Sequence, residues 1–183
     1  MDKVFKAWQF AHRRHSDVGQ IRKYSGEPYI VHPVAVANIL VMHGNPTQDM
    51  VVASLLHDTV EDTNTTLHEI IQEFGVSVAD LVYWLTDVAK PEDGNRAKRM
   101  AINRDHIAKA PAAAQTIKAA DIIHNVKSIV KYNKGFAYKY VPEKRDVCRV
   151  LTKADPALMR LLETTLSEAE NELELTKRGQ NEQ

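Results

Sequence analysis

The sequence holds a single cysteine, Cys148, among its 183 residues. One thiol cannot form an internal disulfide, and it cannot build the thiolate cluster of a structural zinc site. Long apolar runs are also missing, since none approaches the ~18–20 residues that a membrane span needs. The first ten residues place Asp2, Lys3 and Lys6 among their apolar neighbours, so they lack the apolar core of a secretory signal. We therefore expect a cytoplasmic protein that does not enter a membrane.

Neither sign of charge is in excess. Twenty-four Lys and Arg residues balance 24 Asp and Glu residues. Binding to bulk nucleic acid normally requires a basic excess, so we expect no nucleic-acid partner. An anionic ligand would have to be held by a local cluster of cations, and the partner we expect is a small-molecule nucleotide. The sequence leaves the oligomeric state open.

Segments that alternate between polar and apolar residues, as strands do, are missing as well. Apolar residues instead recur three and four positions apart, which is typical of helices with one buried face. This pattern predicts a single all-α domain over residues 1–183, a bundle of roughly eight or nine helices. Thr66 and Glu69 fit a capping box at the start of one helix. The expected helices cover 1–14, 33–42, 47–56, 66–74, 78–88, 96–110 and 112–131, followed by a tyrosine- and lysine-rich connector at 132–140 and two C-terminal helices within 142–177.

Four polar residues form a candidate metal centre. His57 and Asp58 are adjacent where an apolar helix gives way to a polar turn, and His32 lies at the entrance of an earlier helix. Asp121 lies in the small, apolar stretch TIKAADII, where a carboxylate is costly unless it is paired or bound to a cation. Two imidazoles and two carboxylates form a donor set for Mn, Fe, Co or Zn, too rich in nitrogen for a typical Ca or Mg site.

Glu61 and Asp62 follow one helical turn after this His-Asp pair. Water bound to a divalent metal loses several pKa units, and a hydrolase also needs a side chain that orients or deprotonates that water. Glu61 and Asp62 are candidates for this role. The alternative is that they merely precede the next helix and interact favourably with its N-terminal dipole. Their coincidence with four candidate ligands favours the catalytic interpretation.

A polar stripe lies along the helix expected at 112–131, and its apolar neighbours indicate that this helix is largely buried. The stripe is therefore predicted to be a pocket wall rather than a solvated face. It consists of Lys118, Asp121, Asn125 and Ser128. Other histidines are expected outside the site: His124 points off the stripe and is structural, whereas His12 and His15 lie at the surface.

Three separated strings resemble one family. They are RKYSGEPYIVHP at 22–33, LLHDTVEDT at 55–63 and KAADIIHN at 118–125. In this order they resemble the HD-domain hydrolases of the RelA/SpoT group, and more narrowly the small stand-alone alarmone hydrolases. The resemblance covers roughly residues 1–135. It implies an HD-domain helical fold and an enzyme that removes pyrophosphate from the 3′ position of guanosine tetra- and pentaphosphate, leaving GDP or GTP.

The resemblance also implies roles for individual residues. His32, His57, Asp58 and Asp121 would hold Mn²⁺, and the acidic pair at 61–62 would position and activate the attacking water. Arg22 and Lys23 match a basic loop beside the nucleotide base, Tyr29 would line the site, and Asn125 and Ser128 match positions that contact the nucleoside. Lys118 is a local cation that suits phosphate oxygens. The expected substrate-binding residues are therefore Arg22, Lys23, Tyr29, Lys118, Asn125 and Ser128.

One residue departs from the family pattern. Ile122 follows the last candidate ligand, where the family commonly has Lys or Arg. The departure leaves open another substrate for the same metal centre, such as an adenosine alarmone or NADPH at its 2′-phosphate. A catalytically silent HD domain that binds a nucleotide as a regulator is a further alternative, against which the intact acidic pair argues.

Overall fold

The computed structural model describes residues 2–181 and is entirely helical apart from its loops. The described residues contain no strand, and Ile21 forms one isolated antiparallel bridge with Pro28. The all-α prediction is confirmed, and the structure adds one single-turn helix, α4, that the sequence pattern did not indicate. The helices are α1 (Lys3–Asp17), α2 (Val31–His43), α3 (Gln48–Leu56), α4 (Thr59–Asp62), α5 (Leu67–Phe74), α6 (Val76–Leu85), the short 3₁₀ helix η1 (Pro91–Asp93), α7 (Arg96–Lys109), α8 (Ala112–Tyr132), α9 (Lys134–Cys148) and α10 (Pro156–Asn181).

Capping side chains determine where several of these helices begin. The Asp2 carboxylate accepts a hydrogen bond from the Val4 amide, and the Thr47 hydroxyl caps α3. The predicted capping box before α5 is confirmed, since Thr66 and Glu69 each accept a hydrogen bond from the other's backbone amide. Each such cap satisfies an amide that the first helical turn leaves without a partner.

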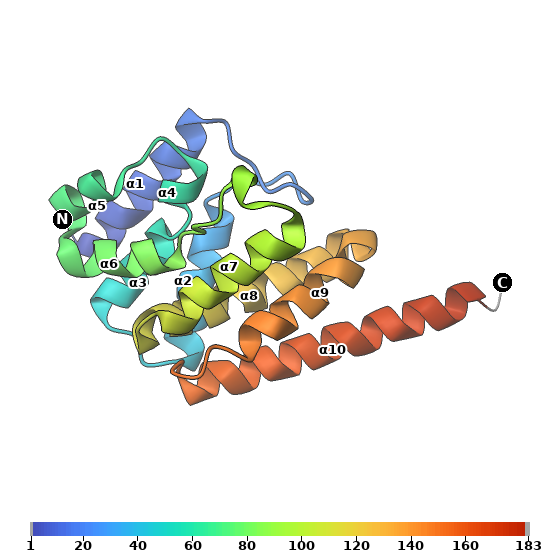
Figure 1. Cartoon of the computed structure of the whole chain (residues 1–183). Coiled ribbons are helices and arrows are strands. Elements are labelled where there is room, and N and C mark those ends of the chain that lie inside the picture. The colour runs from blue at the N-terminus through green and yellow to red at the C-terminus, as the bar shows by residue number, and fades with distance from the viewer. Residues whose placement is uncertain (1, 182–183) are drawn as a thin grey trace.

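The long helix α8 forms the centre of the bundle. It packs against α2, α6, α9 and α10 (Figure 1). Most of its small and branched apolar side chains are buried, and Asp121 is buried among them. A carboxylate in the middle of the core is expensive unless cations or hydrogen-bond donors surround it. Asp121 therefore needs cations or hydrogen-bond donors as neighbours.

The connector predicted at 132–140 is wrong, because α9 begins at Lys134 and continues through Pro142 to Cys148. The Asn133 side chain caps the helix by accepting a hydrogen bond from the Phe136 amide. A proline inside a helix removes one backbone hydrogen bond and costs about 3 kcal/mol or more. The apolar face of α9 offsets this cost, since Ala137, Val141 and their neighbours are buried against the bundle.

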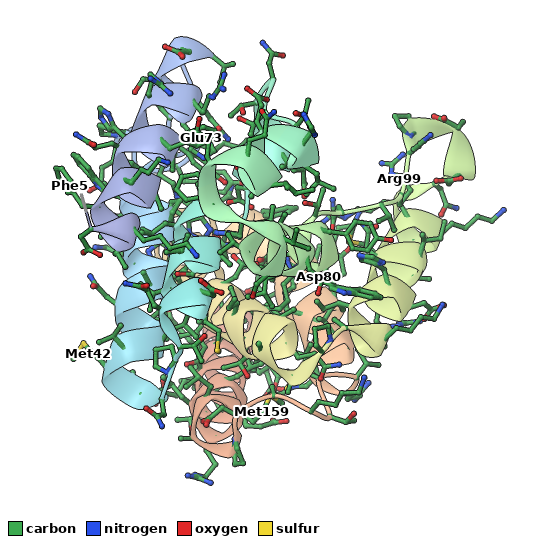
Figure 2. All side chains as sticks on the ribbon, turned by 90° about the vertical axis from the view of Figure 1, so that its left-hand side faces the viewer. Phe5, Met42, Glu73, Asp80, Arg99 and Met159 are labelled. Carbon is green, nitrogen blue, oxygen red and sulfur yellow. The ribbon has the colours of Figure 1, made fainter. Side chains whose placement is uncertain are left out.

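The last helix, α10, packs along α8 and α9, and its C-terminal end extends past the rest of the bundle (Figure 1). On another side of the molecule, Phe5 on α1 and Met42 on α2 lie at the surface (Figure 2), with exposed fractions of 49% and 77%. None of the helices described between residues 2 and 181 combines the length and the apolar character needed to cross a bilayer.

Candidate metal centre and adjoining pockets

Three segments distant in sequence bring the candidate ligands together. His32 lies in the first turn of α2, and His57 directly follows the last residue of α3. Asp58 immediately precedes the single-turn helix α4, and Asp121 lies in the middle of α8. The tight passage from α3 to α4 turns two adjacent side chains toward α2 and α8.

The side chains of these four residues point at a common space. The Nε2 atom of His57 lies 3.0 Å from Oδ2 of Asp58, and Nε2 of His32 lies 3.4 Å from the same oxygen. Oδ1 of Asp121 lies 3.2 Å from Nε2 of His32 and 3.9 Å from Nε2 of His57. Donor atoms of His32, His57 and Asp58 all lie within 4.8 Å of one another. The structure thus places two imidazole nitrogens and the Asp58 carboxylate close enough together for one ion, and the Asp121 carboxylate adjoins them beside His32.

The hydrogen bonding of His57 shows that this space suits a cation. Its Nδ1 lies 2.8 Å from the Ser54 carbonyl, so Nδ1 carries the hydrogen in a neutral ring. Its Nε2 is buried and has no hydrogen-bond partner among the described residues. A nitrogen lone pair is then directed at carboxylate oxygens, which is unfavourable unless a positive charge lies between them. A His-Asp site that can hold a divalent metal is therefore present.

The raised pKa of His57 also indicates that the site favours a positive charge. Burial by itself lowers the pKa of this imidazole, but the charges of Asp58 and Asp121 outweigh burial and raise it to about 9. A proton on Nε2 and a metal ion would use the same electron pair. The site would therefore bind a metal in competition with a proton.

Hydrogen-bond donors from the loop before α2 and from α8 itself hold the two carboxylates in place. The Tyr29 hydroxyl donates to Oδ2 of Asp58 at 2.6 Å, and the Asn125 amide donates to Oδ1 of Asp121 at 2.6 Å. Nζ of Lys118 lies 3.0 Å from the other Asp121 oxygen. Burial would raise the pKa of Asp121, but the Lys118 cation and the two histidines hold it well below its usual range. Both carboxylates are thus ionised and oriented.

Glu61 and Asp62 lie on α4, beside the candidate ligands and at the exposed edge of the site. Oε2 of Glu61 accepts a hydrogen bond from the Asp87 amide at 3.0 Å, which ties the carboxylate to the loop after α6. Surrounding protein atoms disfavour the charged form, and with the charges of Asp87 and Asp58 they raise the pKa of Glu61 to about 7. Partial burial and the Asp58 charge also raise the pKa of Asp62. Glu61 can therefore take up a proton near neutral pH.

Some of the predicted substrate-binding residues lie next to the metal centre or its adjoining groove, whereas Lys23 does not. Arg22 donates to the Asn125 side-chain oxygen at 2.9 Å, so it joins the hydrogen-bond chain that ends at Asp121. Arg22 and Ser128 line one groove of about 270 Å³ between the 18–30 loop and α8. Lys23 is exposed, and its Nζ lies 5.5 Å from the centre of the Tyr24 ring. No described contact brings Lys23 to the metal centre.

Two histidines that the sequence analysis placed outside the site belong to it. Nδ1 of His124 lies 2.7 Å from Nδ1 of His32, so His124 contacts a candidate ligand directly. His15 is buried rather than at the surface, and its Nδ1 lies 2.5 Å from Oε1 of Gln20, whose amide donates to Asp62. Helical spacing in the sequence could have indicated both positions. His15 shares a helix face with the buried Ala11, and His124 lies one turn from Asp121.

Ile122 faces away from these groups. Its side chain is completely buried in the hydrophobic core. The residue that departs from the family pattern is therefore not in the wall of the metal centre, and the observed burial gives no contact through which it could alter the choice of substrate.

The fold and the sequence match known proteins over most of the chain. The profile of the HD-domain family matches residues 7–147. The human guanosine-3′,5′-bis(diphosphate) 3′-pyrophosphohydrolase MESH1 is 33% identical over 167 residues, which is 90% of this chain and 90% of the human protein. The solved structure of a metazoan SpoT ortholog that hydrolyses ppGpp superposes with a TM-score of 0.82 at 25% identity, covering 92% of this chain and 96% of that chain.

Other relatives are longer. A probable GTP pyrophosphokinase from Mycobacterium leprae is 41% identical over 127 residues, and MESH1 from Danio rerio is 35% identical over 126 residues. The aligned part spans 69% of this chain but only 16% of the M. leprae protein, and 68% of this chain but 65% of the D. rerio protein. The family profile, the near full-length match to human MESH1 and the shared helical architecture agree. This chain belongs to the HD-domain family, together with the MESH1 proteins.

Proposed function

We propose that this protein is an Mn²⁺-dependent 3′-pyrophosphohydrolase that converts guanosine tetra- and pentaphosphate into GDP or GTP and pyrophosphate. One observation carries the proposal: two buried histidines and two carboxylates converge with an unpartnered His57 Nε2 at their centre. The HD-domain relatives named for this activity support the choice of substrate, because human MESH1 aligns with nearly all of the chain.

His32, His57, Asp58 and Asp121 would hold the metal. A bound divalent cation supplies Lewis-acid chemistry, because it lowers the pKa of a coordinated water and draws charge from phosphate oxygens. The protein's contribution is to fix the donors. Tyr29 holds Asp58, and Asn125 with Lys118 holds Asp121.

Glu61 and Asp62 act on the attacking water. Glu61 is fixed by the Asp87 amide and has a pKa of about 7, so near neutral pH its carboxylate accepts a proton from water and later releases it. Asp62 is oriented by the Gln20 amide at 2.9 Å. The water oxygen bonds to the phosphorus attached to the ribose 3′ oxygen, the P–O3′ bond breaks, and O3′ takes a proton from solvent. Pyrophosphate and the nucleoside 5′-di- or triphosphate are the products.

The nucleoside fits the groove between the 18–30 loop and α8. Arg22 and Ser128 line this groove with His124 and Tyr132. A guanidinium and an aromatic ring offer flat surfaces for a purine, and a hydroxyl can hydrogen-bond a base or ribose. Arg22 is held by Asn125, so the groove and the metal centre share one hydrogen-bond chain.

The experiment is product chromatography with purified protein, Mn²⁺ and a nucleotide panel. The panel contains guanosine tetraphosphate, its adenosine counterpart and NADPH. We expect guanosine tetraphosphate to give GDP and pyrophosphate, and we expect Asp58→Ala and Glu61→Gln to eliminate turnover. The exposed residue Glu92 in η1 provides the matched control, Glu92→Gln, with wild-type turnover. Orthophosphate as the product, or undiminished turnover in Glu61→Gln, would contradict the proposal.

A further inference from the structure

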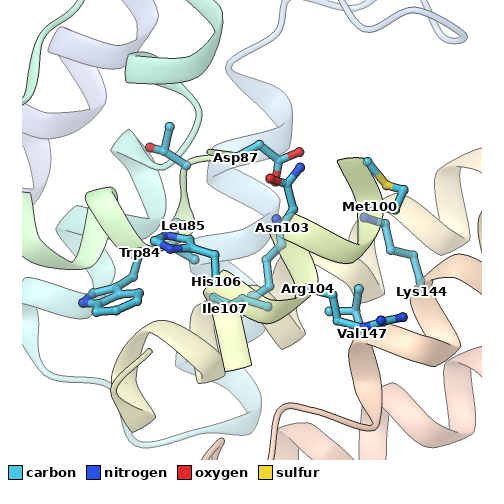
Figure 3. Close-up of a pocket in the computed structure, with 12 residues that line it drawn as sticks. Trp84, Leu85, Asp87, Met100, Asn103, Arg104, His106, Ile107, Lys144 and Val147 are labelled. Atoms are coloured by element: carbon cyan, nitrogen blue, oxygen red, sulfur yellow. The ribbon is translucent and has the colours of Figure 1, made fainter. Parts of the chain in front are cut away.

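A small pocket lies on the far side of Asp121 from the nucleoside groove. The loop after α6 and helices α7, α8 and α9 form its walls (Figure 3). Its cavity volume is about 30 Å³. That is room for about two water molecules, so the pocket can take two oxygens of a phosphoryl group but not a nucleoside.

Lys144 from α9 brings a positive charge into this pocket. Figure 3 shows its side chain extending toward Met100 and Asn103. Among the side chains that the structure describes, no carboxylate lies within 4.0 Å of its Nζ, and the neighbouring Glu143 pairs with Arg96 instead. The nearest aromatic contact is the Tyr140 ring, whose centre lies 5.0 Å from Nζ. A half-buried cation without a counter-charge nearby is unfavourable.

Two more cations line the same pocket, Lys118 from α8 and Arg104 from α7. Asp87 is the acidic lining residue. Burial, followed by the nearby Lys118 charge, lowers the pKa of Lys144, and the charges of Asp121, Asp87 and Glu143 oppose this effect. Lys118 is paired with Asp121, so Lys144 and Arg104 against Asp87 leave the pocket with a net positive charge that an anion would neutralise.

The pocket adjoins the reacting centre through two of its walls. Lys118 lines the pocket and pairs with Asp121, and the Asp87 amide holds Glu61. The three sites follow one another along helix α8. Lys118 lines this pocket, Asp121 belongs to the metal centre, and Ser128 lines the nucleoside groove. A phosphorus atom at the metal centre, with its nucleoside near Ser128, would direct its further phosphoryl group toward Lys118.

We propose that the pocket of Lys118, Lys144 and Arg104 receives the terminal phosphate of the substrate's 3′-diphosphate and holds pyrophosphate after cleavage. This inference rests on the proposed function. It makes Lys144 a residue that selects a diphosphate over a single phosphate at the 3′ position. Lys118 contributes to the same pocket while it orients Asp121.

Direct binding separates this inference from the activity. Inorganic pyrophosphate and orthophosphate are titrated calorimetrically into Mn²⁺-saturated protein, with equal Mn²⁺ in syringe and cell. We expect the wild type to bind pyrophosphate at least tenfold more tightly than orthophosphate, and Lys144→Met to lose most of that preference. Arg104→Met is expected to weaken pyrophosphate binding several-fold. Lys139→Met, at an exposed position of the same helix, is the matched control and should bind as the wild type does.

Thermal unfolding distinguishes a ligand site from a structural role. Because Lys144 is a half-buried charge without an ion-pair partner among the described side chains, Lys144→Met should unfold at the same or a higher temperature. Pyrophosphate should stabilise the wild type more than this variant. Unchanged pyrophosphate affinity in both Lys144→Met and Arg104→Met would overturn the inference, even if the wild type hydrolyses guanosine tetraphosphate. Absence of that hydrolysis, with the binding preference intact, would instead overturn the proposed function.

Discussion

The Nδ1 atoms of His32 and His124 lie 2.7 Å apart, which is hydrogen-bonding distance. Burial, followed by the nearby His32 and Arg22 charges, lowers the pKa of His124 to about 4, so His124 is neutral at pH 7. A lone pair on His32 Nε2 requires the hydrogen on Nδ1, so a metal-binding His32 donates from Nδ1 and His124 accepts. His124 is a partner of a ligand rather than a ligand.

Replacing His124 should therefore weaken metal binding. His124→Phe removes the partner of Nδ1, and loss of such a partner typically costs 10–100-fold in metal affinity. His124→Asn retains a polar group near the Nδ1 position and should recover much of the loss. Calorimetric titration of Mn²⁺ into the metal-free variants measures both. Wild-type affinity in the Phe variant would show that the contact does not orient His32.

The rate should depend on the protonation of Glu61. A carboxyl with a pKa of about 7 is mostly protonated below that pH and cannot accept a proton from water, so kcat/KM should fall as pH decreases through this range. A bound cation would offset the Asp58 charge and move this limb to lower pH. Asp87→Asn keeps the amide that bonds Glu61 but removes a negative charge, so its limb should lie at lower pH than that of the wild type. Identical pH profiles for the two proteins would argue that Glu61 is not the titrating group.

Metal should stabilise the folded protein through the same four residues. A ligand that binds only the folded state at 100 times its Kd adds about 2.7 kcal/mol to the free energy of unfolding. We expect Mn²⁺ to raise the melting temperature of the wild type and a chelator to reverse the increase. His57→Ala will melt at a lower temperature in any case, because a buried ring is lost, so the readout is its response to Mn²⁺. An equal Mn²⁺-induced increase in this variant would place the metal elsewhere.

Substitutions at Ile122 test whether the Lys or Arg common in the family is tolerated at this core position. The Ile122 side chain is fully buried, so Ile122→Lys would bury a charge without a partner and should lower the free energy of unfolding by about 3–5 kcal/mol. Ile122→Met conserves volume and should cost less than about 1.5 kcal/mol. Urea unfolding measures both. A stable Lys variant with a changed substrate preference would show that this position reaches the site.

Pro142 should be replaceable with a gain in stability. Pro142→Ala restores a backbone amide inside α9 and removes the steric clash, and greater freedom of the unfolded chain offsets about 0.4–1 kcal/mol of the gain. We expect a net increase of about 1–2 kcal/mol in the free energy of unfolding. Pro156 begins α10, where proline is favourable, so Pro156→Ala should give no such increase. A destabilised Pro142→Ala variant would mean that the ring contributes packing that the helix needs.

Local signals predicted much of the fold. The capping box of Thr66 and Glu69 and the apolar spacing of α8 depend on neighbours in sequence, and both appear as expected. Helix α9 could not be predicted in this way. Its proline and its polar residues argue against a helix, and only burial of Ala137 and Val141 against the bundle offsets them.

In the candidate site, too, some contacts could be predicted from the sequence and others depend on the tertiary structure. The convergence of His32 and His57 with two carboxylates was expected because the donor types and the family resemblance point the same way. The contact between His124 and His32 joins residues 92 positions apart and leaves only a weak trace in helical spacing. The pocket of Lys144 is similar, since a helix was expected only after residue 141, and without its true start at Lys134 the face that carries Lys144 could not be assigned.

Because Lys118, Asp121 and Ser128 all project from α8, the separation between the two pockets is set by helical rise. Ten residues at 1.5 Å each give about 15 Å along the axis. A rigid rod cannot lengthen to suit a larger ligand, as a loop can. Changes in substrate size during the evolution of such a scaffold must therefore arise in the opposing walls, from α7, α9 and the segment that carries Arg22.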